Sequence, residues 1–109
     1  MIVAAVRLSL LIPEATSLKE KRQALRSLKD RIRHNFNVSV AEVGQLDSWR
    51  RAELLVAAAG NDQQVLNAKM DKLINFVEGT GLAAEVGAEV EFIHLGGAWR
   101  DDHHLARRF

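Results

Sequence analysis

The chain has 109 residues, 15 basic and 14 acidic side chains for a formal net charge of +1, 48% hydrophobic residues and no cysteine. One hydrophobic core built from two packed layers is expected at this length. The absence of cysteine excludes disulfides, thiolate zinc sites and a cysteine nucleophile, and it fits a cytoplasmic location. No apolar stretch approaches the ~20 residues that span a bilayer, so we expect no membrane partner.

A strand and a helix open the chain. Apolar residues occupy the even positions of residues 2–12, which is the period of a half-buried strand, and Pro13 ends it. Residues 17–20 read Ser-Leu-Lys-Glu, a capping box in which the serine caps a helix and the glutamate reaches back to the serine amide. The helix is expected to end at Asn35 or Asn37. Its apolar side consists of Leu18, Leu25, Leu28, Ile32 and Phe36.

Two strands joined by a short polar connection follow, and they predict a hairpin. Residues 37–44 form the first of them, but Glu42 is in phase with the buried valines, so we expect a bulge or a frayed end there. Residues 49–59 form the second. Trp49, at the start of this strand, is expected to cap the core.

A second helix and a fourth strand complete the pattern. Asn61 is the expected cap of the helix, and Gly79 is expected just past its end. Residues 82–95 alternate between apolar and acidic side chains and predict the strand. The order βαββαβ predicts an α+β, ferredoxin-like fold, in which an antiparallel four-stranded sheet carries both helices on one face. The core side of the helix consists of Leu66, Met70, Leu73 and Val77.

The last residues differ in character from the rest. Residues 1–95 are expected to form the ferredoxin-like domain and residues 96–109 a mobile C-terminal tail. His103 and His104 are adjacent in this tail, but no cysteine and no helical histidine spacing accompany them, so we expect no metal site. Trp99 is a candidate for contact with a partner.

The first helix carries the most informative charge pattern. Residues 18–36 hold seven basic and two acidic side chains, a local excess of +5, whereas the second helix has no net charge. Five of the cations fall within an arc of about 80° beside the apolar side. Such a row suits contacts with successive phosphates of RNA. These candidate nucleic-acid-binding residues are Lys19, Arg22, Arg26, Lys29 and Arg33.

Other interpretations of this basic helix remain open. Charge runs are common on solvated faces, and this alternative, with charges neutralised by the acidic side chains of the fourth strand, Glu85, Glu89 or Glu91, is slightly favoured by the sequence alone. Arg50 and Arg51 either extend the basic patch or mark the end of a strand. The central strands lack the aromatic pattern with which sheets read RNA, so RNA would contact the helix side.

Enzymatic activity is not expected. No glycine-rich phosphate loop joins the first strand to the first helix, and Ser17 is better explained as a cap than as a nucleophile. No cofactor is expected either. The alternatives to RNA binding are a homo-oligomeric interaction module, pairing through an edge strand or a sheet face, and a small-molecule sensor with a pocket at its interface.

Four stretches of the sequence are distinctive, namely Ser-Leu-Lys-Glu-Lys-Arg at 17–22, Phe-Asn-Val-Ser-Val-Ala-Glu-Val at 36–43, Asp-Ser-Trp at 47–49 and Gly-Asn-Asp at 60–62. Together they resemble the YlxP-like family of small bacterial proteins. The resemblance covers roughly residues 1–95 and implies a ferredoxin-like fold without established enzymatic activity. It also implies genes beside those of ribosome-maturation and translation-initiation factors, which favours RNA or a ribosomal particle as partner.

Three basic residues lie inside the family's motif, namely Lys19, Lys21 and Arg22. Lys21 is in phase with the apolar side of the helix. We therefore expect Lys21 to extend across the edge of the core and to serve packing instead of binding.

Overall fold

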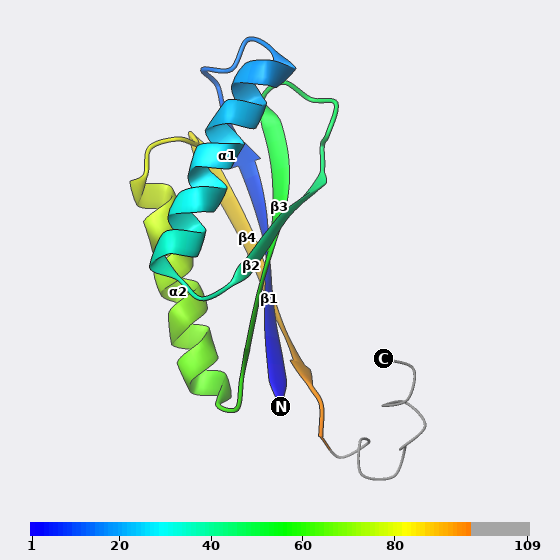
Figure 1. Cartoon of the computed structure of the whole chain (residues 1–109), viewed down its shortest axis with the longest axis vertical. Helices are drawn as coiled ribbons and strands as arrows, with labels where there is room; N and C mark the ends of the chain where they lie inside the picture. Colours follow the sequence, from blue (N-terminus) through cyan, green and yellow to red (C-terminus); the bar gives the residue numbers. More distant parts are fainter. Residues whose placement is uncertain (97–109) are drawn as a thin grey trace.

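The computed structural model describes residues 1–96, and their elements follow the predicted order. The strands form one antiparallel sheet in the order β2-β3-β1-β4, and both helices cover the same face of it (Figure 1). This is the ferredoxin-like α+β fold. The elements are β1 (Ile2–Leu11), α1 (Leu18–Asn35), β2 (Ser39–Gly44), β3 (Arg51–Gly60), α2 (Gln63–Gly79) and β4 (Glu85–His94).

The core lies between the sheet and the helices. At the centre of the sheet, Val6 of β1 is paired with Val56 of β3 and Val90 of β4, so the alternate residues of the three strands share a face. The even positions of β1 and β3 are buried under the helices, and the odd positions form an open face on the other side. The buried set on these two strands is Ile2, Ala4, Val6, Leu8, Leu10, Ala52, Leu54, Val56 and Ala58.

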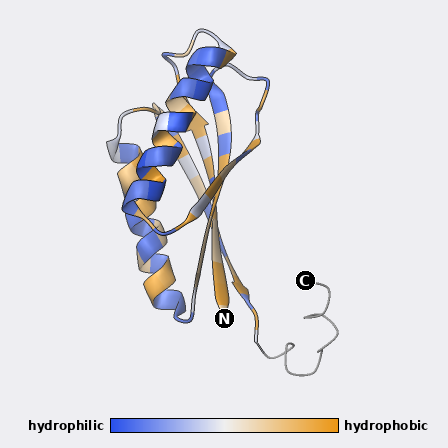
Figure 2. Ribbon diagram, viewed as in Figure 1, coloured by the Kyte–Doolittle hydropathy of each residue, from blue (hydrophilic) through white to orange (hydrophobic). Residues whose placement is uncertain are grey.

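Both helices present their predicted apolar stripes to this core. Leu25, Leu28 and Ile32 of α1 are buried, as are all four stripe residues of α2, while the rest of α1 is largely hydrophilic (Figure 2). At the edge of the core, the rings of Phe36 and Phe76 meet edge to face with centroids 5.6 Å apart. The amphipathic pattern therefore fixes which side of α1 remains free.

The start of α1 differs in one detail from the predicted capping box. The Ser17 hydroxyl accepts a hydrogen bond from the Glu20 amide at 3.2 Å, as expected. The Glu20 carboxylate, however, accepts from the amide and the hydroxyl of Thr16, at 3.1 and 2.7 Å, and not from the Ser17 amide. Both donors of Thr16, its amide and its hydroxyl, thus take the place of the Ser17 amide that the capping box predicts.

The predicted ends of α2 were wrong by one or two residues. Asp62, and not Asn61, is the cap, because its carboxylate accepts from the amides of Gln64 and Val65 at 2.9 and 3.3 Å. The helix includes Gly79, and the left-handed residue that follows is Gly81 with a φ of 71°.

The strand boundaries also shifted. The predicted irregularity in β2 is confirmed as a register shift between Glu42 and Gly44. β3 begins at Arg51, two residues later than predicted, and β4 begins at Glu85 instead of residue 82. From residue 97 onward, the predicted tail, with Trp99, His103 and His104, lies outside the described residues.

Candidate nucleic-acid interface

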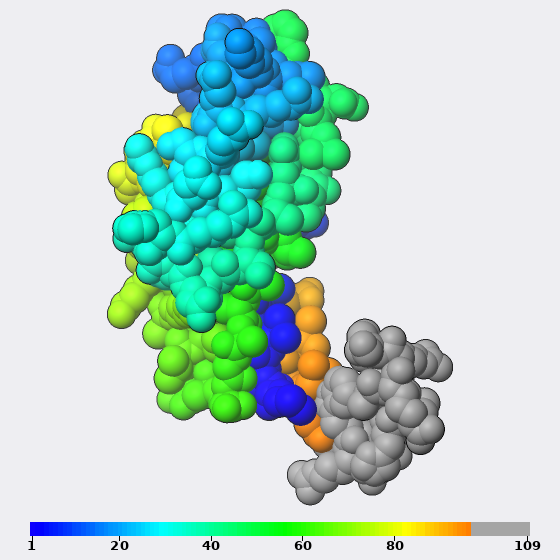
Figure 3. All heavy atoms as spheres, viewed as in Figure 1, coloured from blue at the N-terminus to red at the C-terminus, as the bar shows by residue number. Residues whose placement is uncertain are grey.

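The basic arc of α1 is exposed in the structure. Lys19, Arg22 and Arg26 are exposed, and Lys29 is half-buried. Within residues 1–96, none of these four side chains forms an ion pair or a side-chain hydrogen bond. In Figure 3 the atoms of α1 form much of the visible surface of the domain. We call these four residues, with Arg33, the basic arc.

Arg33 differs from the other four because it is partly engaged. Its guanidinium donates a hydrogen bond to the Val40 carbonyl at 2.8 Å and lies 3.9 Å from the Asp30 carboxylate. The side chain is still 48% exposed. Since Val40 belongs to β2, this contact places Arg33, at the C-terminal end of the arc, beside the edge strand of the sheet.

Lys21 is the one motif lysine that is withdrawn from the surface. It is 1% exposed, its ammonium donates to the Gln45 carbonyl at 2.6 Å, and it lies 3.3 Å from the Glu42 carboxylate. Glu42 alternates in phase with the buried Val40 and is paired with the buried Leu54, so it lies on the core side, where it meets this charge. Lys21 therefore joins the first turn of α1 to the end of β2, and it is not part of the binding surface.

The acidic residues of β4 do not neutralise the basic arc. Glu85, Glu89 and Glu91 lie on the open face of the sheet, opposite to the helices, because they alternate with the residues packed on the core. Glu89 forms an ion pair with Arg7, and Glu85 lies 3.7 Å from Arg51. The basic arc and these carboxylates therefore lie on opposite sides of the molecule.

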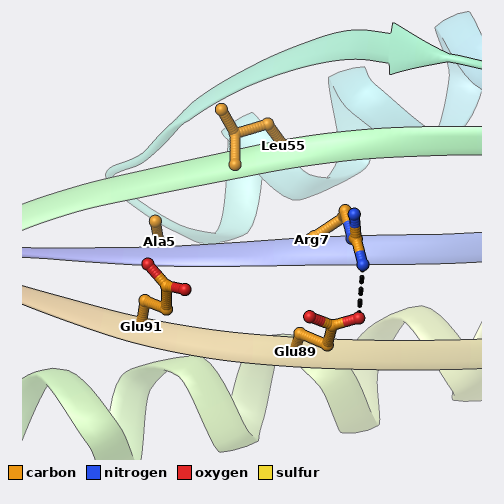
Figure 4. A pocket seen from close by; sticks show the side chains of 5 residues that line it. All are labelled: Ala5, Arg7, Leu55, Glu89 and Glu91. Carbon is orange, nitrogen blue, oxygen red and sulfur yellow. Dashed lines mark hydrogen bonds and ion pairs between the residues drawn. The ribbon is translucent and has the colours of Figure 1, made fainter.

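An open hollow on this sheet face is lined by small and charged side chains (Figure 4). Arg7 and Glu89 meet there, and this contact raises the pKa of the Arg7 guanidinium above its ordinary value. The second carboxylate of the lining, Glu91, forms no ion pair within residues 1–96. Its lining consists of Ala5, Arg7, Leu55, Glu89 and Glu91.

The connection between β2 and β3 lies beside the first turn of α1. Arg50 donates from its Nε to the Ala15 carbonyl at 3.2 Å, so it holds this connection instead of extending the basic arc, and Arg51 pairs with β4. Trp49 is 55% exposed and does not cap the core, contrary to the prediction. The sequence did not indicate that Trp49 is exposed, because an apolar ring at the end of a strand is equally compatible with burial.

Two further expectations concern metals and membranes. Within residues 1–96, no group of three or more histidine, cysteine, aspartate or glutamate side chains lies close enough together to hold a metal ion. In the same part of the chain, neither helix combines the length and the apolar character that crossing a bilayer requires.

The fold and the exposed basic helix define a small ferredoxin-like α+β domain with one polar, cationic side. Two de novo designed proteins share the fold, although their sequences differ. One, LFR1 1 with a ferredoxin fold, is 11% identical with a TM-score of 0.54, and the match covers 91% of this chain and 92% of that one. The other, Foldit4, is 9% identical with a TM-score of 0.50. That match covers 87% of this chain and 98% of Foldit4.

The sequence places the chain more narrowly. It belongs to the family described as protein of unknown function DUF503, whose model matches residues 3–90. It is also 32% identical over 68 residues to the uncharacterized protein YlxP of Bacillus subtilis. The aligned residues cover 62% of this chain and 74% of YlxP. The resemblance to the YlxP-like family is thereby confirmed.

Proposed function

We propose that this protein is a non-catalytic cytoplasmic domain that binds structured RNA, alone or in a ribosomal particle, through the basic arc of α1. The observation that supports this proposal is the separation of charge. Four of the five cations have no ionic partner within residues 1–96, while the acidic side chains of β4 lie on the opposite face. Within residues 1–96, the acid in ion-pair contact with the basic arc is Asp30, 3.9 Å from Arg33. A face with neutralised charges, the competing interpretation, would need more acids than this beside the arc.

The dimensions of the arc suit a nucleic-acid backbone. From Lys19 to Arg33 the helix rises about 21 Å, at ~1.5 Å per residue. Cations three or four residues apart follow one line along this length and repel each other, which weakly opposes helix formation. A phosphate backbone removes that repulsion and releases its condensed counterions on binding.

The mode of recognition follows from what surrounds the arc. The open sheet face carries no aromatic side chain within residues 1–96, so stacking on the sheet does not contribute. Lysine and arginine on a helix contact phosphates without reading base edges. We therefore expect preference for RNA shape and charge, with little dependence on the sequence of a stem.

The experiment compares two charge reversals on the same helix. Arg26→Glu lies within the basic arc, whereas Arg31→Glu makes the same change at an exposed position on the other flank of α1. Binding of a fluorescein-labelled RNA stem-loop, measured by anisotropy, should weaken on the order of tenfold in the first variant and remain near wild type in the second. Equal losses in both variants, or none in either, would refute the proposal.

A second candidate function, self-association, is favoured by the open face of the sheet. Leu55, Ile93 and Val43 are 40 to 48% exposed there, next to small side chains of β1 and β3. Covering the whole face would bury roughly 600 Å² per copy, near the lower end of stable interfaces. The occupant would be a second copy of this chain.

Light scattering tests this candidate. A dimer that uses the open face should dissociate in Leu55→Glu and persist in Val65→Glu, which alters an exposed apolar residue of α2. A monomeric wild-type protein at high micromolar concentration would refute it. The RNA proposal is independent of this result, because the basic arc lies on the other side of the sheet.

A further inference from the structure

The connection between β2 and β3 presents two apolar side chains to solvent. Leu46 is 58% exposed and Trp49 is 55% exposed. Single exposed apolar residues are common on protein surfaces. An exposed tryptophan is less common, because its ring has a large apolar area. Leaving that area in water gives up a large part of the free energy that burial would provide.

This connection is held in place from both ends. At one end, Lys21 donates to the Gln45 carbonyl at 2.6 Å, and Gln45 has a left-handed φ of 58°. At the other end, Arg50 donates to the Ala15 carbonyl and its own carbonyl accepts from the Ile12 amide at 2.6 Å. Trp49 therefore sits on a fixed backbone.

Internal bonds fix the turn itself. The Ser48 amide donates to the Gln45 carbonyl at 3.1 Å, and the Ser48 hydroxyl accepts from the Arg51 amide at 3.0 Å. The exposure of the neighbouring tryptophan is therefore built into the folded turn. A ring presented on a rigid support loses little conformational freedom when it binds.

The turn that carries Trp49 is connected to the helix that carries the basic arc. Gln45 follows β2, the strand that Arg33 contacts, and it is bonded to Lys21, which is next to Arg22 in the first turn of α1. The turn and the start of α1 lie at the same end of the molecule (Figure 1). The turn that carries Trp49 therefore lies next to the start of α1, where the basic arc begins.

We infer that Trp49 stacks on an unpaired base of the RNA whose phosphates contact the basic arc. This rests on the proposed function and specifies its substrate, a stem with an adjoining single-stranded loop, bulge or end. Aromatic rings stack on splayed bases in single-stranded RNA but have no access to bases within an A-form stem. Leu46 is a second exposed apolar side chain in the same connection.

An RNA is favoured over a protein partner by the charges around the turn. Lys19 and Arg22 lie in the adjoining first turn of α1, and neither forms an ion pair within residues 1–96. Asp47 is the acidic residue of the turn. Free cations beside a stacking ring are the pairing that single-stranded nucleic-acid sites use.

The test uses the intrinsic fluorescence of this ring. In a Trp99→Phe variant of the full chain, Trp49 is the sole tryptophan. Titration with an RNA stem-loop should quench its emission in a saturable manner, and a blunt duplex of the same stem should leave it largely unchanged. Binding of both RNAs is followed in parallel by anisotropy of a fluorescein label.

A second pair of variants measures the contribution to affinity. Trp49→Ala should weaken stem-loop binding roughly tenfold or more, and Trp49→Phe should reduce the affinity for the stem-loop much less. Neither variant should change duplex binding appreciably. Stem-loop binding that is unquenched and insensitive to Trp49→Ala refutes the stacking while leaving the basic arc intact. Absence of binding to either RNA refutes both proposals.

Discussion

At the scale of single residues, Lys21 shows how one charge can be removed from a binding surface by its surroundings. Its neighbours on the sequence, Lys19 and Arg22, point to solvent, but Lys21 falls on the core side of α1. There it lies against Glu42 and the Gln45 carbonyl. A buried charge persists only when it is paired and hydrogen-bonded, and both conditions are met.

Removing one partner of this pair should therefore be costly. Lys21→Ala leaves Glu42, whose side chain is 20% exposed, without its counter-charge. We expect the free energy of unfolding to fall by about 3 kcal/mol, measured by urea denaturation followed by circular dichroism.

The double variant Lys21→Met/Glu42→Leu provides the control, because it replaces the pair by apolar groups and should recover most of the stability. A loss below about 1 kcal/mol in Lys21→Ala, typical of a surface substitution, would contradict the burial of this charge.

At the scale of an element, the start of α1 responds to pH. Two hydrogen bonds from Thr16 lower the pKa of the Glu20 carboxyl below its ordinary value. A carboxylate with a lowered folded pKa stabilises the protein above its unfolded pKa of about 4.3. That contribution is lost as the pH falls through the folded pKa.

Glu20→Gln should consequently be less stable than the wild type at neutral pH and closer to it near pH ~3. Thermal unfolding of both proteins across this range measures the difference. A stability gap that stays constant over the whole range would show that the charge on Glu20 does not contribute.

Much of each element could be predicted because local patterns determine it. The core stripes of both helices and the alternation of β1 and β3 follow from the hydrophobic period, and the structure buries the residues concerned. Element ends were less accurate, since neighbouring side chains compete for the same amides. Asp62 replaced Asn61 as cap, and Thr16 replaced Ser17 as the partner of Glu20.

The candidate site was predictable only in part. Helical spacing placed Lys19, Arg22 and Arg26 together on an exposed side, because it depends on α1 alone. The contact of Arg33 with Val40 and the exposure of Trp49 depend on how β2 and its following turn pack against α1. Such long-range contacts leave no periodic signal in the sequence.

At the scale of the whole molecule, the fold separates two surfaces. The helix layer carries the basic arc, and the open sheet face carries the carboxylates of β4 with the apolar side chains around Leu55. Because one sheet lies between them, occupation of one surface does not block the other. A dimer formed through the sheet would display two basic arcs facing outward, and two linked sites increase the apparent affinity for a long RNA.

The salt dependence of RNA binding tests the central claim most directly. If the basic arc contacts four or five phosphates, the logarithm of the binding constant of the wild type should fall with the logarithm of salt concentration with a slope of about −3 to −4.5. Arg22→Glu/Arg26→Glu should reduce that slope by about 2, and Arg31→Glu should leave it unchanged. A wild-type slope near zero, or the same slope in all three proteins, would contradict the account.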